Sequence, residues 1–236
     1  MSSSRTNGLS LALCAAIGLV AASSANAART SGAEVTAAVR HDTLHSLRGV
    51  MPRPDDFFKN SHAYPAHPLP FLSAPGNQTD GALQTAVSGG FAPALGAGFD
   101  GVGQGFSGPQ GTFSVNSAPP DTNGAVGATQ YLQIVNSAFA VFDKSSKAVV
   151  YGPVPTNTLW KGFGGPCEAD NDGDAVVVYD KAQNRWVVSQ FAVTAAPYYQ
   201  CVAVSATSDA TGAWYRYAFP YGSVFPDYPK MGVWPD

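Results

Sequence analysis

Hydrophobic and polar residues alternate in short runs over the C-terminal half of the chain. From Phe113 onward, runs rich in Val, Tyr, Phe and Trp are separated by Gly, Asn, Asp and Ser. Runs of this length, bounded by turn residues, are typical of β-strands. The predicted strands are Tyr131–Val135, Ala138–Phe142, Ala148–Tyr151, Ala175–Tyr179, Arg185–Val193, Gln200–Ser205 and Trp214–Phe219. No ten-residue amphipathic pattern lies among them, so residues 113–236 are predicted to form an antiparallel all-β domain.

The spacing of these runs indicates how the strands connect. The last four, from Ala175 to Phe219, fit a four-stranded up-and-down meander. Val141–Val150 and Val178–Val187 share a strand, an Asp-Lys pair, a polar turn and a second strand at an offset of 37 residues. A period of about 40 residues with several strands per period is the spacing of a propeller blade. We therefore expect a partial β-propeller, and a small β-sandwich of the same hairpins is the alternative.

One turn and three motifs add to this expectation. Ser208–Trp214 resembles the Asp-box turn of propellers with one extra residue, which implies a capping Asp, a strained Gly and a Trp packed between blades. The three motifs are PPDTNGAVG at 119–127, GDAVVVYD at 173–180 and FPDYPKMGVWPD at 225–236. They resemble motifs of a group of secreted bacterial β-propeller-like proteins over about residues 113–236. That group has no established activity, so the resemblance implies a fold and a location but no catalytic residue.

The end of the sequence suggests that blades are missing. The segment after Met231 has the pattern of a first strand of a further blade, and residues 113–236 hold about three blades at most. A propeller closes with four to eight blades. We therefore expect the β domain to be truncated at its C-terminal end.

The N-terminus has the pattern of an export signal. Arg5 precedes an uncharged run from Leu9 to about Ala22, which is too short to span a bilayer. Ala25 and Ala27 form an A-x-A site, so cleavage is predicted after Ala27. The mature protein is therefore expected to be secreted or periplasmic. No later segment is long and apolar enough to be transmembrane, and we expect a monomer.

Residues 28–112 differ in composition and hydrophobic pattern from the predicted β domain. Apolar residues between Ser31 and Arg48 keep a rough helical spacing, which predicts one short amphipathic helix. Beyond it, proline-punctuated and glycine-rich stretches follow one another as far as Gly111. Such stretches bury little apolar surface for the backbone entropy that they would lose. Residues 28–112 are therefore predicted to be a flexible, largely irregular arm or pro-segment.

The low content of charged residues limits the kinds of molecule that the protein is expected to bind. Charged residues make up 12% of the 236 residues and the net charge is −3, with a pI near 5.7. The usual charged fraction is about 25%, so the surface must be polar mainly through uncharged side chains. The sequence has no basic region that could bind nucleic acid or an anionic membrane. Both are therefore excluded as expected partners.

Two cysteines remain after cleavage, Cys167 and Cys201. Thiols oxidise in an exported protein, so a disulfide between them is expected, with two separately buried thiols as the alternative. The bridge would stabilise the fold by roughly 3–4 kcal/mol on the chain-entropy model.

A short acidic loop follows Cys167. Its acids are Glu168, Asp170, Asp172 and Asp174. Alternating acids around a glycine can wrap a hard cation, so these four are candidate Ca²⁺ ligands. The loop does not fit the EF-hand pattern, in which a bidentate Glu would stand where Tyr179 is. The alternative is a solvated turn in which Asp174 caps the entrance of the next strand.

Catalytic groups are sparse in the β region. All four histidines, at 41, 45, 62 and 67, precede it, which disfavours Ser-His-Asp and Cys-His chemistry there. The spacing of His41 and His45 is better explained by a polar helix face than by a metal site. Arg185 and Arg216 are too few for a sialidase site. Aspartates are plentiful, but most lie beside Gly or Pro in turns, where capping is their usual role.

Aromatic residues are the remaining candidates. Tyr198-Tyr199, the segment 214–221 and Phe225–Tyr228 form a dense Tyr, Trp and Pro surface on which sugars or peptides could stack. Trp186, Trp214 and Trp234 are predicted to lie in the core rather than on this surface. The leading hypothesis is a non-enzymatic binding or surface-interaction module for a glycan or protein ligand. The alternative is a polysaccharide-active hydrolase or lyase, whose catalytic residues the sequence does not identify.

Overall fold

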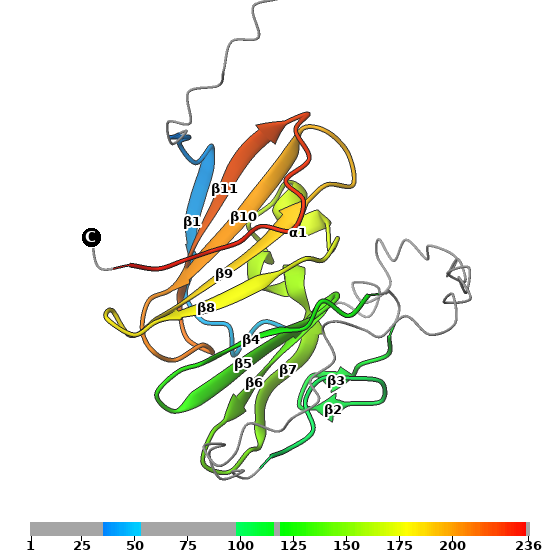
Figure 1. Ribbon diagram of the computed structural model, residues 1–236, viewed down its shortest axis with the longest axis vertical. Helices are drawn as coiled ribbons and strands as arrows, with labels where there is room; N and C mark the ends of the chain where they lie inside the picture. Colours follow the sequence, from blue (N-terminus) through cyan, green and yellow to red (C-terminus); the bar gives the residue numbers. More distant parts are fainter. Residues whose placement is uncertain (1–34, 53–97, 116–118, 235–236) are drawn as a thin grey trace, which may run out of the picture. The chain divides into compact units, whose positions relative to one another are not determined.

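The computed structural model describes residues 35–52, 98–115 and 119–234, which form an all-β fold of mostly antiparallel strands (Figure 1). The first large sheet is a meander in which each strand pairs with the next along the chain. Its strands are β4 (Asn123–Val126), β5 (Gln130–Val135), β6 (Ala138–Asp143) and β7 (Val149–Pro155).

The second large sheet repeats this meander and adds one strand from the N-terminal part. Its order is β1-β11-β10-β9-β8, with all neighbours antiparallel. The strands are β1 (Arg40–Leu44), β8 (Val176–Asp180), β9 (Arg185–Ala192), β10 (Tyr198–Ser205) and β11 (Trp214–Gly222). All seven predicted strands and the predicted four-stranded meander are therefore confirmed, with small shifts at their ends.

The structural repeat differs from the predicted one. The Asp-Lys pair at 143–144 lies in the turn between β6 and β7, whereas the pair at 180–181 lies between β8 and β9. These are the third turn of one meander and the first turn of the next, so the offset between the two pairs does not relate equivalent strands. The strands that begin the two meanders, β4 and β8, start at Asn123 and Val176, which are further apart in the chain. The similarity comes from two hairpin turns of the same chemistry.

The predicted helix between Ser31 and Arg48 is wrong over residues 40–44. These residues form β1, which pairs with the first half of β11, from Arg40 opposite Ala218 to Leu44 opposite Trp214. The Asp42 carboxylate accepts hydrogen bonds from Arg216 Nε and Nη2 at 2.7 and 2.6 Å. Pairing with a distant strand therefore outweighs the local helical spacing. No local sequence pattern reveals this partner strand.

A small hairpin packs against the first sheet. It consists of β2 (Ser107–Gly108) and β3 (Gly111–Thr112) and contacts β7. Val102, Phe106 and Phe113 flank it and pack with Phe142 of β6 in a separate apolar cluster. The described parts of the segment expected to be an arm thus contribute to the fold, while residues 28–34 and 53–97 of that segment lie outside the described residues.

The main core lies between the two large sheets. It combines Leu132, Ile134 and Val141 of the first sheet with buried side chains of the second, among them Trp186 and Trp214. The connection between the sheets adds the 3₁₀ helix η2 (Thr156–Trp160) and the short helix α1 (Pro166–Ala169). β4 and β8 lie side by side where the sheets meet (Figure 1), and the Val177 backbone N–H donates to Asn123 Oδ1 at 2.8 Å.

The turn between β10 and β11 partly matches the Asp-box expectation. Asp209 Oδ1 accepts hydrogen bonds from the backbone N–H and the hydroxyl of Thr211 at 2.9 and 2.7 Å, and Trp214 is fully buried in the core. The glycine is the exception, because Gly212 does not adopt a positive φ. Asp209 also accepts from Gln130 Nε2 of the first sheet at 3.0 Å, so this turn joins the two sheets.

The predicted disulfide is confirmed. Cys167 and Cys201 are bonded, and both are buried, so that α1 is tied to β10. The predicted signal peptide and its cleavage site at Ala25 and Ala27 lie outside the described residues. No helix within the described residues is long and apolar enough to cross a membrane.

Candidate functional site

Three aspartates, one from each sequence motif, converge at the starts of the meanders. Asp121 precedes β4, Asp174 precedes β8, and Asp227 lies in the segment after β11. The three are equally spaced along the chain. The Asp174 carboxyl is hydrogen-bonded to that of Asp121 and also feels the charge of Asp227. The fold therefore brings the carboxyls of Asp121 and Asp174 into contact and places Asp227 near them.

Asn136, in the turn between β5 and β6, joins two of these aspartates. Its Nδ2 donates to Asp121 Oδ2 at 2.7 Å, and its Oδ1 accepts from the Asp174 backbone N–H at 2.9 Å. Gly173 has a φ of +107°, and a Cβ there would lie 2.6 Å from Asn136 Oδ1. Both the backbone angle and the close approach thus require a glycine at this position.

The environment of Asp174 favours the protonated form. Burial is the main cause of its raised pKa, and the hydrogen bond with Asp121 and the charges of Asp121 and Asp227 act in the same direction. Asp121 and Asp174 also adopt positive φ values of 38° and 48°, a region that costs energy for residues other than glycine. A carboxyl with a raised pKa beside a second carboxyl is an arrangement that can serve acid–base chemistry.

The acidic loop is used mostly for backbone capping. Glu168 Oε2 accepts from the Gly164 backbone N–H at 2.7 Å, and Asp172 accepts from the Val193 backbone N–H at 2.6 Å. Asp174 belongs to the group described above. In the part of the chain that the structure describes, no three His, Cys, Asp or Glu side chains are grouped so that they could hold a metal ion. The structure therefore does not show the predicted calcium site at Glu168, Asp170, Asp172 and Asp174.

Asp170 is the one acid of this loop that is nearly fully buried. Burial, followed by the charge of Asp172, raises its pKa to about 6. Hydrogen bonds from Thr194 oppose these effects without cancelling them. Asp170 therefore takes up its proton at a pH near 6, well above the ordinary range for an aspartate.

The tryptophans divide into core and surface. Trp186 and Trp214 are fully buried, as predicted, and so is Trp160. Trp234 is 83% exposed, so its predicted place in the core is wrong. Its neighbours in the surface hollow that it lines are Tyr179, Asp180 and Lys181.

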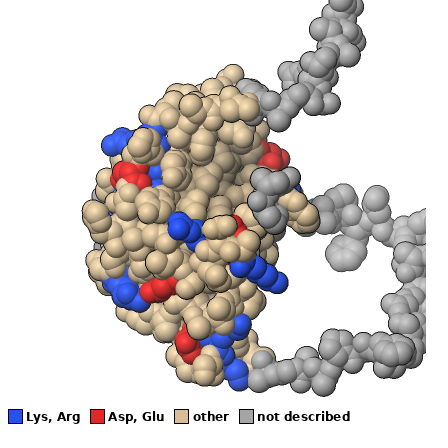
Figure 2. Space-filling view, turned by 90° about the vertical axis from the view of Figure 1, so that its left-hand side faces the viewer, with Lys and Arg blue, Asp and Glu red and all other residues tan. Residues whose placement is uncertain are grey.

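Aromatic side chains gather at one end of the second sheet. Phe225 is 51% exposed, and its ring lies 5.7 Å from that of Phe191 and 5.8 Å from that of Tyr198. Tyr221 is 44% exposed and adjoins Gly222, which pairs with Tyr198 across β10 and β11. Tyr198, Tyr221 and Phe225 are called the aromatic end below. Charged residues are sparse and scattered on the face of the molecule shown in Figure 2, as the composition predicts.

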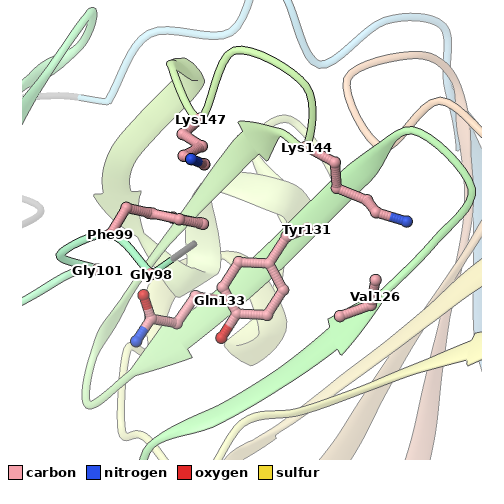
Figure 3. A pocket seen from close by; sticks show the side chains of 8 residues that line it. All are labelled: Gly98, Phe99, Gly101, Val126, Tyr131, Gln133, Lys144 and Lys147. Carbon is pink, nitrogen blue, oxygen red and sulfur yellow. The ribbon is translucent and has the colours of Figure 1, made fainter. Parts of the chain in front are cut away.

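A pocket of about 460 Å³ opens on the first sheet, on the side of the Phe142 cluster. Figure 3 shows the Tyr131 ring between Phe99 and Val126, with Gln133 beside it and Lys144 and Lys147 from the turn between β6 and β7. The sequence analysis missed this pocket. Tyr131 and Gln133 stand at alternate positions of β5, but nothing local shows that residues 98–101 return to cover them.

No family model matches the chain, and no curated protein or solved structure matches it. Function therefore has to be inferred from the residues that the fold brings together.

Proposed function

We propose that this chain is an exported, β-propeller-like binding module that holds a glycan or a protein through uncharged aromatic side chains. The observation that carries the proposal is the aromatic end, which lies where β10 begins and β11 ends. The rings of Tyr198 and Phe225 are in contact there, and Tyr221 and Phe225 are exposed. Exposed tyrosine and phenylalanine rings offer large contact area at low entropic cost, which suits them to recognition.

The propeller-like architecture is supported by the convergence of the three motif aspartates. In a propeller the inner strand of each blade begins beside a common axis. Asp121 and Asp174 stand just before β4 and β8, and these first strands are neighbours. Asp227 approaches them from the segment that follows the second meander. A small sandwich offers no reason for three equally spaced residues to lie near one another.

Export is supported by two features. The N-terminal sequence has the pattern of a cleavable signal, and the mature part contains a disulfide between Cys167 and Cys201. Disulfides form and persist in oxidising compartments. The resemblance of the three motifs to secreted bacterial β-propeller-like proteins agrees with this location and stays a prediction.

A binding screen tests the proposal. The full chain, produced with its signal for export, is presented to immobilised polysaccharides and to cell-surface protein extracts separated into identified components. The Tyr198→Ala, Tyr221→Ala, Phe225→Ala triple variant is expected to lose about tenfold or more in affinity for the ligand found. Val150→Ala, which removes exposed apolar surface elsewhere, should bind as the unaltered chain does. Failure of every probe to bind would contradict the proposal.

A second candidate function is favoured by the Asp121–Asp174 contact. A polysaccharide hydrolase or lyase needs a group that stays protonated near neutral pH, and the pKa of Asp174 is raised by its surroundings. The full chain is tested for turnover of a panel of polysaccharides. Turnover that Asp174→Asn abolishes and Asp180→Asn retains would establish the enzymatic function. A full panel without turnover would remove it and leave the binding function in place.

A further inference from the structure

The pocket on the first sheet is a separate site from the aromatic end. Its walls come from β4, β5, the β6–β7 turn and residues 98–101, none of which contributes to the aromatic end. Its volume of about 460 Å³ falls within the range of ~300–1,000 Å³ typical of small-ligand sites. Phe99 at its rim is 43% exposed and Lys144 is exposed, so a ligand can enter from solvent.

One wall of the pocket is aromatic and held in place. The Phe99 ring meets Tyr131 edge-on at 6.2 Å and Phe142 at 5.2 Å. Tyr131 packs in turn on Phe142 at 5.8 Å. At Gly124 of β4, a Cβ would lie 2.5 Å from the Tyr131 hydroxyl, so glycine is needed for the ring to lie where it does. The wall is therefore a preformed surface on which a ring can stack.

The polar groups that remain free in the pocket are mostly donors. Gln133 Oε1 accepts from the Val102 backbone N–H at 2.8 Å, which leaves its Nε2 to donate into the pocket. At Gly101, any side chain would collide with this amide, so the close approach depends on glycine. Burial raises the pKa of the Tyr131 hydroxyl, which therefore keeps its proton and can also donate.

Two ammonium groups add positive charge. Lys144 Nζ donates to the carbonyls of Gly127 and Ala128 at 2.9 and 3.1 Å and has one N–H left. Lys147 makes no side-chain hydrogen bond or ion pair to any residue that the structure describes. The nearby Asp143 carboxylate is occupied by the backbone and hydroxyl of Ser146, and none of the lining residues is acidic.

We propose that this pocket binds a carboxylated sugar ring, such as a uronate unit of an acidic polysaccharide. The C–H face of the sugar ring packs against Phe99, and the ring's oxygens accept hydrogen bonds from Gln133 and Tyr131. The carboxylate pairs with Lys147, because an ammonium that makes no ion pair with any described residue is best satisfied by an anionic ligand. The inference goes beyond the proposed binding function, because it assigns a second site with a ligand class of its own.

The test compares two probes that differ at the carboxyl group, which is charged in one and a neutral methyl ester in the other. Oligogalacturonate and its fully methyl-esterified form are titrated separately into the full chain by calorimetry at low salt. The free acid should bind, and the ester should bind at least about fivefold more weakly because the neutral ester loses the ion pair. Lys147→Gln should weaken binding of the acid by a similar factor without changing binding of the ester. Lys181→Gln, an exposed lysine on the β8–β9 turn, is the matched control and should change nothing.

The outcomes separate this inference from the proposed function. Equal binding of acid and ester, or full affinity in Lys147→Gln, would overturn the pocket assignment. If the acid binds but its binding is lost in the aromatic-end triple variant instead, the pocket assignment fails while the proposed function stands. Absence of binding by every glycan and protein probe would overturn both. Phe99→Ala, which truncates a ring at the rim, should weaken the acid and the ester alike and so tests the stacking wall independently of charge.

Discussion

Gly127 is the residue at which the packing of the two large sheets is most sharply constrained. A Cβ at this position would lie 2.6 Å from Cζ2 of Trp186 and 3.1 Å from Tyr179. The Trp186 ring is fully buried, and its Nε1 donates to the Ser208 carbonyl at 2.9 Å. The indole therefore has no room to move away from an added methyl group.

We expect Gly127→Ala to lower the free energy of unfolding by about 1–3 kcal/mol, the usual cost of overpacking a core. Gly103→Ala is the control, because a Cβ there meets nothing within 4 Å. Chemical denaturation of both variants gives the comparison. Equal stability of the two would show that the sheets do not pack at Gly127 as described.

Asp170 gives the fold a defined dependence on pH. Its pKa is about 6 in the folded chain, against an ordinary value of 3.8. The folded state therefore holds this proton more tightly than the unfolded state, and Asp170 makes stability fall as pH rises from about 4 to 6. Above this window the full penalty applies, and a rise of about two pKa units corresponds to about 3 kcal/mol.

Asp170→Asn should accordingly be more stable than the unaltered chain at pH 7 by about 2–3 kcal/mol and equally stable at pH 3.5. Thermal melts between pH 3.5 and 7.5 measure the difference. Asp100→Asn removes an exposed carboxylate and serves as the control. A stability difference for Asp170→Asn that does not grow with pH would contradict the assignment.

At the scale of elements, β1 depends on one ion pair. Arg216 of β11 has only 4% of its side chain exposed. It donates to Asp42 of β1 and, through Nη1, to the carbonyls of Leu159 and Lys161. Removing the carboxylate leaves part of a buried guanidinium unpaired. Since the Asp42 side chain is 36% exposed, water can reach the gap and reduce the cost.

Asp42→Ala should therefore lower the free energy of unfolding by about 2 kcal/mol, less than the ~3–5 kcal/mol for breaking a fully buried pair. Thr43→Ala changes an exposed neighbour on the same strand and should cost less than about 0.5 kcal/mol. Urea denaturation compares the variants. A cost for Asp42→Ala no larger than that for Thr43→Ala would contradict the role given to this ion pair.

The elements also show which parts of the fold are predictable from sequence. The seven predicted strands carry strong apolar and aromatic character between turn residues, so local pattern suffices for them. β4 escapes prediction because its sequence, NGAV, contains a glycine and only one β-branched residue. The pattern of β1 misleads because its partner β11 lies at the far end of the described chain. The same kind of separation hides the pocket, whose rim and floor come from distant segments.

At the scale of the whole molecule, the repeat of one meander by the next is not apparent from the sequence. The three sequence motifs at the starts of the meanders and after β11 are apparent. Asp121, Asp174 and Asp227 have the pattern of turn residues, because each lies beside Gly, Pro or Thr. Their convergence becomes visible only when the two meanders are folded side by side. The acidic loop shows the opposite case. Its local pattern predicts a calcium site, but its Glu168 and Asp172 carboxylates accept hydrogen bonds from separate backbone N–H groups.

The two candidate functions place the ligand at different points on the molecule. A binding module uses the aromatic end, which lies where β10 begins and β11 ends. A hydrolase or lyase uses the carboxyls of Asp121 and Asp174 where the meanders begin. The acidic-sugar pocket on the first sheet is distinct from both, so a map of ligand contacts along the chain distinguishes all three.

Hydrogen exchange of the full chain, with and without the ligand identified by the screen, gives that map most directly. We expect added protection at residues 198–200 and 220–226, where the aromatic end lies. An acidic glycan should add protection at residues 98–102 and 131–133. Protection confined to the segments around Asp121 and Asp174, with none at the aromatic end, would contradict the proposed binding function.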